Sequence, residues 1–536
     1  MMNRFVMLCR MTALLLTPIA HDQGGWGKSD VVPTHLRCEY RENPLGIDVE
    51  KPRLSWVIED RGQKSDVRGR RQTAYQVLVA SSEELLRKNK GDLWHSGKVA
   101  SDQSIQVEYQ GKPLESRMYC HWKVRVWLAA SKLPGEGGDK KGKAMDWSQP
   151  AFWSMGLLDP EDWQARWIKP AAANQSIPTA PWFRKEFTLA AAPERATAFV
   201  NVKGYGELYV NVKKVGDDVL APAVAVYRKR TLYNTYDISK LLRAGRNCVG
   251  VWLGTGWHWP GPLARVQLDM SVGGQRVVVG TDPTWTFMQS SHTEFAWGWN
   301  GNGHESIDAR REIAGWSEAE CTAGEWLPVE EIAAPSGVAT AQSCPPNRIT
   351  GVIPLAACTA LNTNTWELDF GANLTGWLRL RLPRLESGKR VVMYYADKRF
   401  QTAEGDDTPA GLIKPMMPRK FDTPQGPVRY QNYGQEDDFI SAGKPGEQFC
   451  SKFNYRGFRY VIVEGLPARP APGDAEALMI ESDPEPAGTF ECSNDLFNRI
   501  HQVNLWTVRC LNLGGYMVDC SHRERMRRGR TDSAVL

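Results

Sequence analysis

Short runs in which apolar and polar residues alternate occupy most of this chain. Clear examples lie at 73–79, 120–127 and 205–212, and glycine, proline and aspartate punctuate the segments between runs. A period of two residues over four to eight positions is typical of β-strands that bury one face. The pattern therefore predicts a mainly β protein made of tandem β-sandwich or jelly-roll domains.

Breaks in this pattern divide the chain, and 536 residues are too many for a single hydrophobic core. Further strands are predicted at 365–370, 377–382 and 460–464, whereas the polar segment 402–448 is expected to be a long loop with short strands at most. The predicted units are 1–20, a signal peptide; 31–158, a fibronectin-like β-sandwich; 162–335, a second sandwich or jelly roll; 341–482, a third sandwich; and 488–536, the start of a helical domain.

The period of the apolar positions changes near the end of the chain. Beyond residue 493 they recur every three or four residues, at Leu496, Ile500, Val503, Trp506 and Cys510. This spacing predicts one face of a helix. Ser493 is its expected N-cap, and Gly514 and Gly515 are expected to end it.

Charge and hydropathy exclude several classes of protein. Lys and Arg number 66 against 61 Asp and Glu, and no basic stretch is interleaved with aromatic residues, so nucleic-acid binding is not expected. After the N-terminus no apolar run is long enough to predict a membrane span. Arg4 and Arg10 precede the apolar run 11–20, which is typical of a secretory signal and predicts a secreted or periplasmic protein. The alternative is an irregular N-terminus that is not cleaved, and the sequence predicts no oligomeric state.

Tryptophan and cysteine are the two unusual residue types to interpret. The 21 tryptophans are spread along the chain, where indole rings either fill sandwich cores or stack on sugar rings, and the core role is the commoner one. The 11 cysteines include no C-x-x-C pair, so neither a zinc site nor a regular disulfide framework is predicted.

Nine short strings give the chain a more specific signature than its composition does. They are LRCE (36–39), NPLGID (43–48), PRLSW (52–56), LWHSG (93–97), GYGELYVN (204–211), LYNTYD (232–237), ESIDAR (305–310), DFGANLTGW (369–377) and FNYRGFRY (453–460). In this order and spacing, the strings resemble the bacterial α-L-rhamnosidases of glycoside hydrolase family 78. The resemblance implies release of terminal α-L-rhamnose from rhamnose-containing glycans or glycosides with inversion.

The most specific string is DCSHRER (519–525), which resembles the segment that opens the (α/α)6 catalytic barrel of that family. The resemblance implies that Asp519 and Arg523 bind substrate and that Glu524 is the general acid. His522 is more typical of a packing or hydrogen-bonding histidine than of a metal ligand, because no second His or Cys stands at metal-ligand spacing. We place it with the substrate-binding residues. Asp532 is a further candidate for the acid, displaced by about one residue from the family pattern.

Taken without the resemblance, Asp519, Arg523 and Glu524 are more typical of a surface ion pair, which contributes little. Glycoside hydrolysis usually needs two carboxyl groups flanking the scissile bond, about 6.5–9.5 Å apart in inverting enzymes. Residues five positions apart on a helix point about 140° from each other. A residue other than Asp519 must therefore supply the second carboxylate.

Twelve barrel helices need on the order of 200–300 residues, and 44 residues run from Ser493 to Leu536. We therefore expect the first helix of a barrel that is otherwise missing. We also expect no useful glycoside hydrolysis by this chain, so that Glu524→Gln would change nothing measurable.

Two functional hypotheses stay open. The first is an α-L-rhamnosidase of which this chain is an incomplete part. The second is a non-catalytic carbohydrate-binding protein, for which segment 204–218 with Trp252, Trp257 and Trp259 is the candidate surface. No cofactor is expected at the catalytic segment, and the resemblance allows calcium in the second β domain without identifying its ligands.

Overall fold

The computed structural model describes residues 31–60, 71–129, 144–171, 179–256, 258, 261–294, 297–298, 301–302, 304–400, 419–513 and 516–517. Over these residues the protein consists mainly of β-strands, with two α-helices, α1 (Glu83–Arg87) and α2 (Asp495–Leu511). The predicted fold class, a mainly β chain followed by a helix, is confirmed. The expected signal peptide lies outside the described residues, so export stays a prediction.

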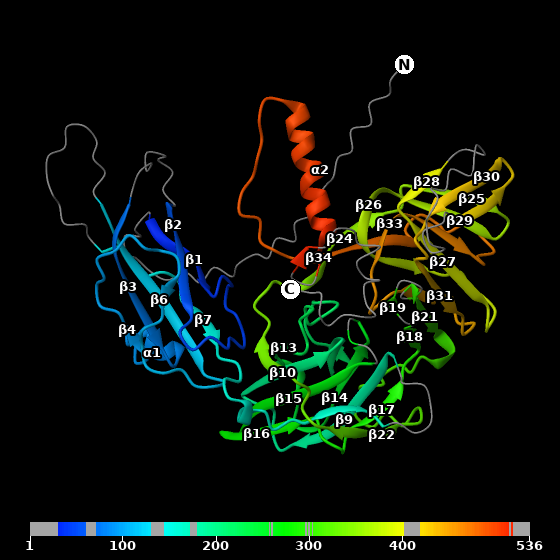
Figure 1. Cartoon of the computed structure of the whole chain (residues 1–536). Helices are drawn as coiled ribbons and strands as arrows, with labels where there is room; N and C mark the ends of the chain where they lie inside the picture. The colour runs from blue at the N-terminus through cyan, green and yellow to red at the C-terminus, as the bar shows by residue number, and fades with distance from the viewer. Residues whose placement is uncertain are drawn as a thin grey trace.

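The first sandwich packs two small antiparallel sheets against each other, drawn in blue in Figure 1. Their orders are β1–β2–β5 and β4–β3–β6–β7. The strands are β1 (Val31–Cys38), β2 (Arg53–Asp60), β3 (Gln72–Ala80), β4 (Trp94–His95), β5 (Val107–Glu108), β6 (Tyr119–Leu128) and β7 (Ala151–Ser154). Trp56, Trp122 and Trp153 are fully buried in the core between them.

The second sheet has 12 strands in the order β12–β11–β14–β9–β17–β22–β8–β15–β10–β13–β23, with β16 paired to β15. Strands far apart in this order, such as β10 and β14, line the same apolar core, so the sheet folds back into two layers. The strands are β8 (Trp167–Pro170), β9 (Pro181–Leu189), β10 (Arg195–Lys203), β11 (Tyr205–Val210), β12 (Lys213–Lys214), β13 (Arg230–Asp237), β14 (Gly245–Gly254), β15 (Leu263–Val272), β16 (Gln275–Gly280), β17 (Thr286–Gln289), β22 (Leu327–Ile332) and β23 (Val338–Ala341). Short 3₁₀ turns flank them, η1 (Pro160–Asp162), η2 (Ser239–Leu241) and η3 (Ala309–Arg311).

The third sheet has ten strands, in the order β18–β21–β31–β27–β33–β26–β34–β24, with β25 and β32 both paired to β26. They are β18 (His292–Glu294), β21 (Glu305–Asp308), β24 (Asn347–Pro354), β25 (Ala357–Asn362), β26 (Thr365–Arg381), β27 (Arg390–Ala396), β31 (Glu436–Ile440), β32 (Gln448–Cys450), β33 (Arg456–Glu464) and β34 (Ala475–Ser482). Three small sheets complete the fold, from β19 (Trp297–Gly298) with β20 (Gly301–Asn302), β28 (Lys398–Phe400) with β29 (Arg419–Thr423) and β30 (Gly426–Gln431), and β35 (Asn512–Leu513) with β36 (Tyr516–Met517).

Strand β26 differs from the prediction for its segment. It runs through 365–370 and on to Arg381, whereas the sequence pattern predicts separate strands at 365–370 and 377–382. Its register against β33 shifts between Asp369 and Leu374, so the intervening residues make an irregularity within one strand. The prediction of two strands is therefore wrong at this point.

The second and third sheets exchange chain segments. Residues of β18 and β21 precede β22 in the sequence, yet β21 pairs in parallel with β31 of the third sheet, with Ser306 opposite Asp438. The later strand β23 pairs in parallel with β13 of the second sheet. The two sheets thus share connections that cross between them in both directions.

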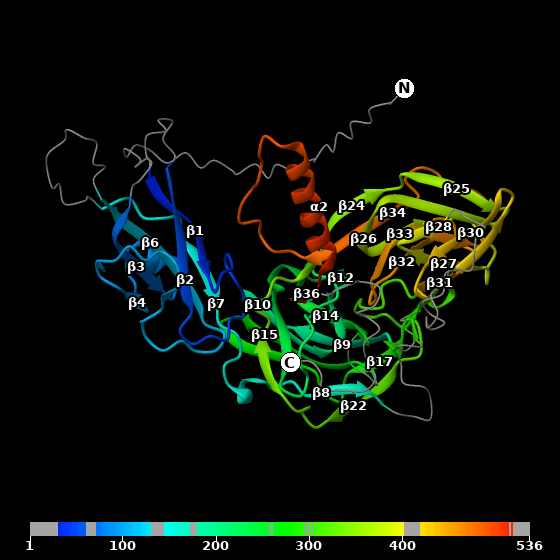
Figure 2. The ribbon, with the colours of Figure 1, turned by 45° about the horizontal axis from the view of Figure 1, so that its top comes forward.

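Helix α2 follows β34 and projects from the third sheet. Figure 1 and the turned view of Figure 2 both show it projecting away from the third sheet, near β24 and β34. Within the described residues, neither helix combines the length and the hydropathy that a bilayer crossing requires.

One ion pair lies fully inside the third sheet. Arg456 on β33 donates through Nε to Oδ2 of Asp437 on β31 at 3.0 Å, and both side chains are inaccessible to solvent. Asp437 also accepts from the backbone N–H of Glu305 on β21, at 2.9 Å. This carboxylate therefore joins three strands of the sheet.

We predict that Asp437→Ala destabilises the third sheet by about 3–5 kcal/mol, because it removes the carboxylate that pairs directly with the buried Arg456 guanidinium. The measurement is urea unfolding of the full chain. Asp422→Ala is the matched control, because Asp422 on β29 makes an exposed pair with Lys420, and should unfold like the unmodified protein. Equal unfolding curves for both variants would contradict the role given to Asp437.

Candidate functional site

The five site residues expected from the sequence lie outside the described residues. They are Asp519, His522, Arg523, Glu524 and Asp532, and their placement stays a prediction. The structure does describe α2, which leads into that segment, and the junction of the second and third sheets beneath it.

Helix α2 begins one residue later than predicted. The Asn494 side chain caps it by accepting from the backbone N–H groups of Leu496 at 2.9 Å and Phe497 at 3.4 Å. Ser and Asn are both good caps, so the prediction of Ser493 was wrong by one position. The helix ends at Leu511, and the predicted stop at Gly514 and Gly515 lies outside the described residues.

The C-terminal half of α2 is fixed on the third sheet. Trp506 donates from its indole nitrogen to the carbonyl of Asn373 on β26 at 2.7 Å. Arg509 donates to both carboxylate oxygens of Glu481 on β34, to Oε1 at 2.7 and 2.9 Å and to Oε2 at 3.1 Å. A bidentate pair of this kind defines orientation as well as distance. The sheet therefore sets the direction in which the chain leaves α2.

The other half of the predicted apolar face of α2 is open to solvent. Leu496 is 62% exposed and Val503 64%, and Phe497 and Ile500 are also exposed. Among the described residues none covers these side chains. Contiguous apolar surface of this kind usually marks a contact site, so α2 presents a face suited to packing against further structure.

A buried charged cluster joins the second and third sheets. Lys452, just after β32, reaches Oε2 of Glu207 on β11 at 2.9 Å. Lys214 on β12 lies 3.4 Å from Oε1 of the same carboxylate. The Lys452 ammonium also lies 4.6 Å from the ring centroid of Trp252 on β14, a cation–π contact. Two sheets thus meet around a single ammonium group.

The ionisation of Glu207 depends on these neighbours. Burial by itself would raise the pKa of the carboxyl, but the charges of Lys452 and Lys214 and the hydrogen bonds from Lys452 and Tyr209 outweigh it. They hold the pKa of Glu207 below its ordinary value. Glu207 also raises the pKa of Lys452 against the effect of burial. Both groups are therefore charged at neutral pH.

Two further buried carboxylates, Glu294 and Glu305, lie beside this cluster. His292 on β18 contacts Glu305 on β21 at 2.7 Å between Nδ1 and Oε1, and the backbone N–H of Lys452 donates to both oxygens of Glu305. Glu294 accepts from the backbone N–H of Thr255 at 2.5 Å. Burial first, and then the charge of Glu305, raises the pKa of Glu294 well above the ordinary value.

The aromatic surface proposed for sugar binding is largely interior. Trp252 is 7% exposed and packs against Trp182, His292 and Phe453. A Cβ on Gly254 would lie 2.3 Å from the Phe453 ring, so this glycine permits close contact between the sheets. The expectation that Trp252 lies on a binding surface was wrong, because it belongs to an interdomain core. Trp257 and Trp259 lie outside the described residues.

The described residues give no metal centre of the usual side-chain type. No group of three or more His, Cys, Asp or Glu among them is arranged to hold a metal ion, and the described cysteines are free thiols. The buried carboxylate of Glu207 already has two lysine partners. Calcium in the second β domain stays a prediction.

The sequence of the chain matches known protein domains and known relatives. Four family descriptions match in order: a Rha78A-like, N-terminal immunoglobulin domain (33–159), the α-L-rhamnosidase N-terminal domain (191–351), the bacterial α-L-rhamnosidase concanavalin-like domain (359–481) and the bacterial α-L-rhamnosidase 6 hairpin glycosidase domain (485–529). An α-L-rhamnosidase of Formosa agariphila is 30% identical over 525 residues, covering 90% of this chain and 51% of that protein. Over most of its length the chain is therefore similar to the bacterial α-L-rhamnosidases.

Further α-L-rhamnosidases are similar to this chain over the same range. One from Alteromonas sp. is 27% identical, covering 92% of the chain and 52% of that protein. The solved α-L-rhamnosidase from Dictyoglumus thermophilum superposes with a TM-score of 0.77 at 29% identity, covering 90% of this chain and 52% of that one. The chain spans about half the length of the curated relatives it matches.

Sequence reasoning missed the Glu207–Lys452 contact. A signal was present, because Glu207 interrupts the otherwise apolar and aromatic run 205–210. A carboxylate in a strand that is otherwise buried requires a partner. The partner lies 245 positions away, where no local pattern identifies it.

We predict that Lys452→Met lowers the free energy of unfolding by about 2–4 kcal/mol at pH 7, since Glu207 then keeps only Lys214 as a counter-charge. In the unmodified protein the depressed pKa of Glu207 gives stability above the ordinary pKa that is lost as pH falls. In the variant, burial favours the protonated acid. The difference in the free energy of unfolding between the unmodified protein and Lys452→Met should therefore shrink as pH falls from 7 toward 4.5. The measurement is urea unfolding at several pH values.

Two further variants make this prediction specific. Glu207→Gln added to Lys452→Met should restore most of the lost stability, because no uncompensated charge remains. Lys213→Met on β12 removes an exposed lysine next to Lys214 and should leave unfolding unchanged. A stability loss in Lys452→Met that is independent of pH and not relieved by Glu207→Gln would assign the loss to packing instead.

Proposed function

We propose that this chain is part of an α-L-rhamnosidase that releases terminal α-L-rhamnose from rhamnose-containing glycans or glycosides. The observation that carries the proposal is the ordered match of four rhamnosidase domain descriptions, ending in the glycosidase domain at 485–529. A solved relative from Streptomyces avermitilis is described as complexed with L-rhamnose, which supports rhamnose as the sugar recognised.

The proposed roles of the catalytic segment follow the family pattern. Glu524 is the general acid that protonates the leaving oxygen, and Asp519 and Arg523 bind rhamnose hydroxyls together with His522. Asp532 is the alternative acid. An inverting reaction also needs a carboxylate across the scissile bond to activate water, which would come from outside this segment.

The described structure supports this assignment through α2. Its C-terminal half is fixed by Trp506 and Arg509 to the third sheet, and its first half exposes an apolar face. A helix held in this way delivers the following segment from a fixed direction, and its open face suits packing against other helices of a glycosidase domain. Reaction groups must be positioned within a closed site for general acid catalysis to act.

We also propose export of the protein. The support is the arginine-led apolar run in residues 1–20. Secretion would bring the enzyme to rhamnose-containing glycans outside the cell.

The activity test uses this chain joined to the C-terminal half of the Formosa agariphila relative, with the unjoined chain as reference. We expect the joined protein to hydrolyse an aryl α-L-rhamnoside in preference to other aryl glycosides. Glu524→Gln should lower kcat by about 10²–10⁴-fold, the usual contribution of a general acid. Glu491→Gln, an exposed glutamate just before α2, is the control and should keep full turnover. Preference for another glycoside, or full activity in Glu524→Gln, would contradict the proposal.

A further inference from the structure

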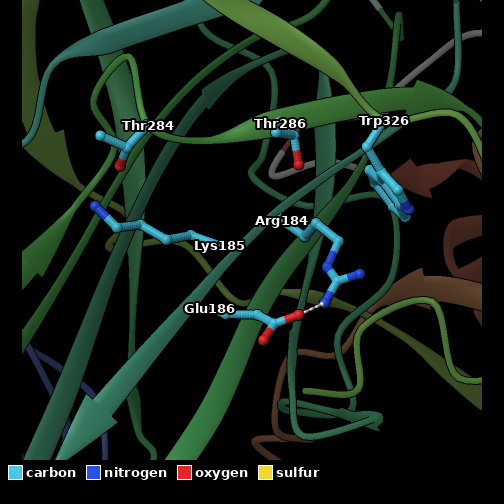
Figure 3. A pocket seen from close by; sticks show the side chains of 6 residues that line it. All are labelled: Arg184, Lys185, Glu186, Thr284, Thr286 and Trp326. Carbon is cyan, nitrogen blue, oxygen red and sulfur yellow. Dashed lines mark hydrogen bonds and ion pairs between the residues drawn. The ribbon is translucent and has the colours of Figure 1, made fainter. Parts of the chain in front are cut away.

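A depression of about 390 Å³ opens to solvent on the second sheet, far from α2. Its walls come from β9, from β17 together with Thr284, and from Trp326 just before β22. Figure 3 shows the side chains that line it. These strands lie at the opposite side of the molecule from α2 in both Figure 1 and Figure 2. The lining residues are Arg184, Lys185, Glu186, Thr284, Thr286 and Trp326.

The depression forms because two neighbouring strands end at different points. Strand β9 pairs with β14 as far as Leu189. Its pairing with β17 ends where Thr286 lies opposite Arg184. Beyond that pair, the β17 side of β9 is left without a neighbouring strand among the described residues. Lys185 and Glu186 therefore border an opening rather than a continuous sheet.

The indole of Trp326 forms one wall and is held rigidly. Its ring centroid lies 5.1 Å from the guanidinium of Arg184, and its Nε1–H donates to the carbonyl of Ala323 at 2.9 Å. Arg184 is itself buried and donates to the carbonyls of Cys321 and Glu318, both at 2.9 Å. Figure 3 shows the guanidinium directed toward the indole. A ring fixed in this way loses little conformational entropy when a ligand stacks on it.

The polar groups around the depression are balanced in charge. Lys185 pairs with Asp282 at 2.7 Å, and Glu186 pairs with Arg246 at 2.8 Å as well as with Arg184. Arg246 has a second carboxylate partner, Glu320, at 2.6 Å. Each cation thus has a carboxylate partner, so the site has no surplus positive charge for a phosphate or a sulfate. Donors, carboxylate oxygens and threonine hydroxyls lie instead around a rigid aromatic wall.

A neutral pyranose ring matches this combination. The C–H groups on one face of such a ring carry partial positive charge and stack on the negative face of an indole. Its hydroxyl groups both donate and accept, so they can bind carboxylate, ammonium and threonine groups together. A few placed polar groups beside an aromatic wall are what fixes the orientation of a small ligand.

We propose that this depression is a second carbohydrate site, which binds a neutral pyranose residue of a glycan by stacking on Trp326. The site lies on the opposite side of the molecule from α2 and does not depend on the activity of Glu524. Occupied together with the hydrolytic site, it would hold a glycan at two points. Two linked contacts raise the local concentration of the chain at each of them.

The test labels the full chain with 5-fluorotryptophan and follows ¹⁹F resonances during titration. The probes are methyl α-L-rhamnoside and methyl β-D-galactoside as neutral sugars, with D-galacturonate and inorganic phosphate as anions. Trp326→Phe identifies the resonance of Trp326 by its loss. Trp147→Phe identifies a control, since Trp147 in the first sandwich also stacks on a cation, Arg125, at 4.7 Å and lines no described depression.

We expect a neutral sugar to shift the Trp326 resonance saturably and to leave that of Trp147 unchanged. Trp326→Ala should weaken retardation of the protein in gels containing a neutral rhamnose- or galactose-bearing polysaccharide by about tenfold, equivalent to about 1.4 kcal/mol. Thr286→Val, which removes one lining hydroxyl and leaves the indole in place, should weaken it less. Trp147→Ala should migrate like the unmodified protein.

Three outcomes would overturn the proposal. One is no shift of Trp326 with either neutral sugar at tens of millimolar, a range in which weak sugar sites with affinities of about 1 mM would saturate. Another is a shift with galacturonate or phosphate alone, which would indicate an anion site. The third is equal gel retardation of Trp326→Ala and Trp147→Ala. Each is read from binding, so loss of rhamnoside hydrolysis in Glu524→Gln has no bearing on it.

Discussion

The contact between Lys452 and Glu207 is the constraint on which the relation of the second and third sheets depends. Lys452 belongs to the third sheet's part of the chain, and its ammonium group contacts Glu207 and Trp252 of the second sheet. A charge removed from water must be paired, or burying it costs several kcal/mol. The two sheets can therefore shift relative to each other only by breaking this pair, which makes their junction rigid.

The rigidity of this junction extends to α2. Tryptophans and tyrosines of both sheets form one apolar cluster that also includes Leu513, just beyond the helix. Arg509 and Trp506 then fix the helix to strands β34 and β26 of the same unit. Helix α2, which precedes the segment proposed to act on rhamnosides, is thus fixed to a base that consists of two sheets.

Much of the fold could be predicted from local patterns, and the failures have physical causes. Alternation predicted β3 and β6, because each buries side chains within a single sandwich. It divided β26 in two, since the irregularity at 369–374 interrupts the alternation without ending the strand. The carbohydrate-binding hypothesis placed Trp252 on a surface, because the Phe453 that covers it comes from the third sheet's part of the chain. The catalytic residues came from family resemblance alone, because their spacing by itself is also that of an ordinary ion pair.

The parallel pairing of β21 with β31 limits how this protein can be divided into fragments or recombined between genes. A segment early in the chain is a structural strand of a later sheet, so a cut between the two sheets in the sequence is not a cut in space. A fragment containing 341–482 alone would expose the edge of β31, a row of unpaired backbone groups that favours aggregation. Recombination between genes would preserve folding more readily by exchanging the second and third sheets together than by exchanging either one.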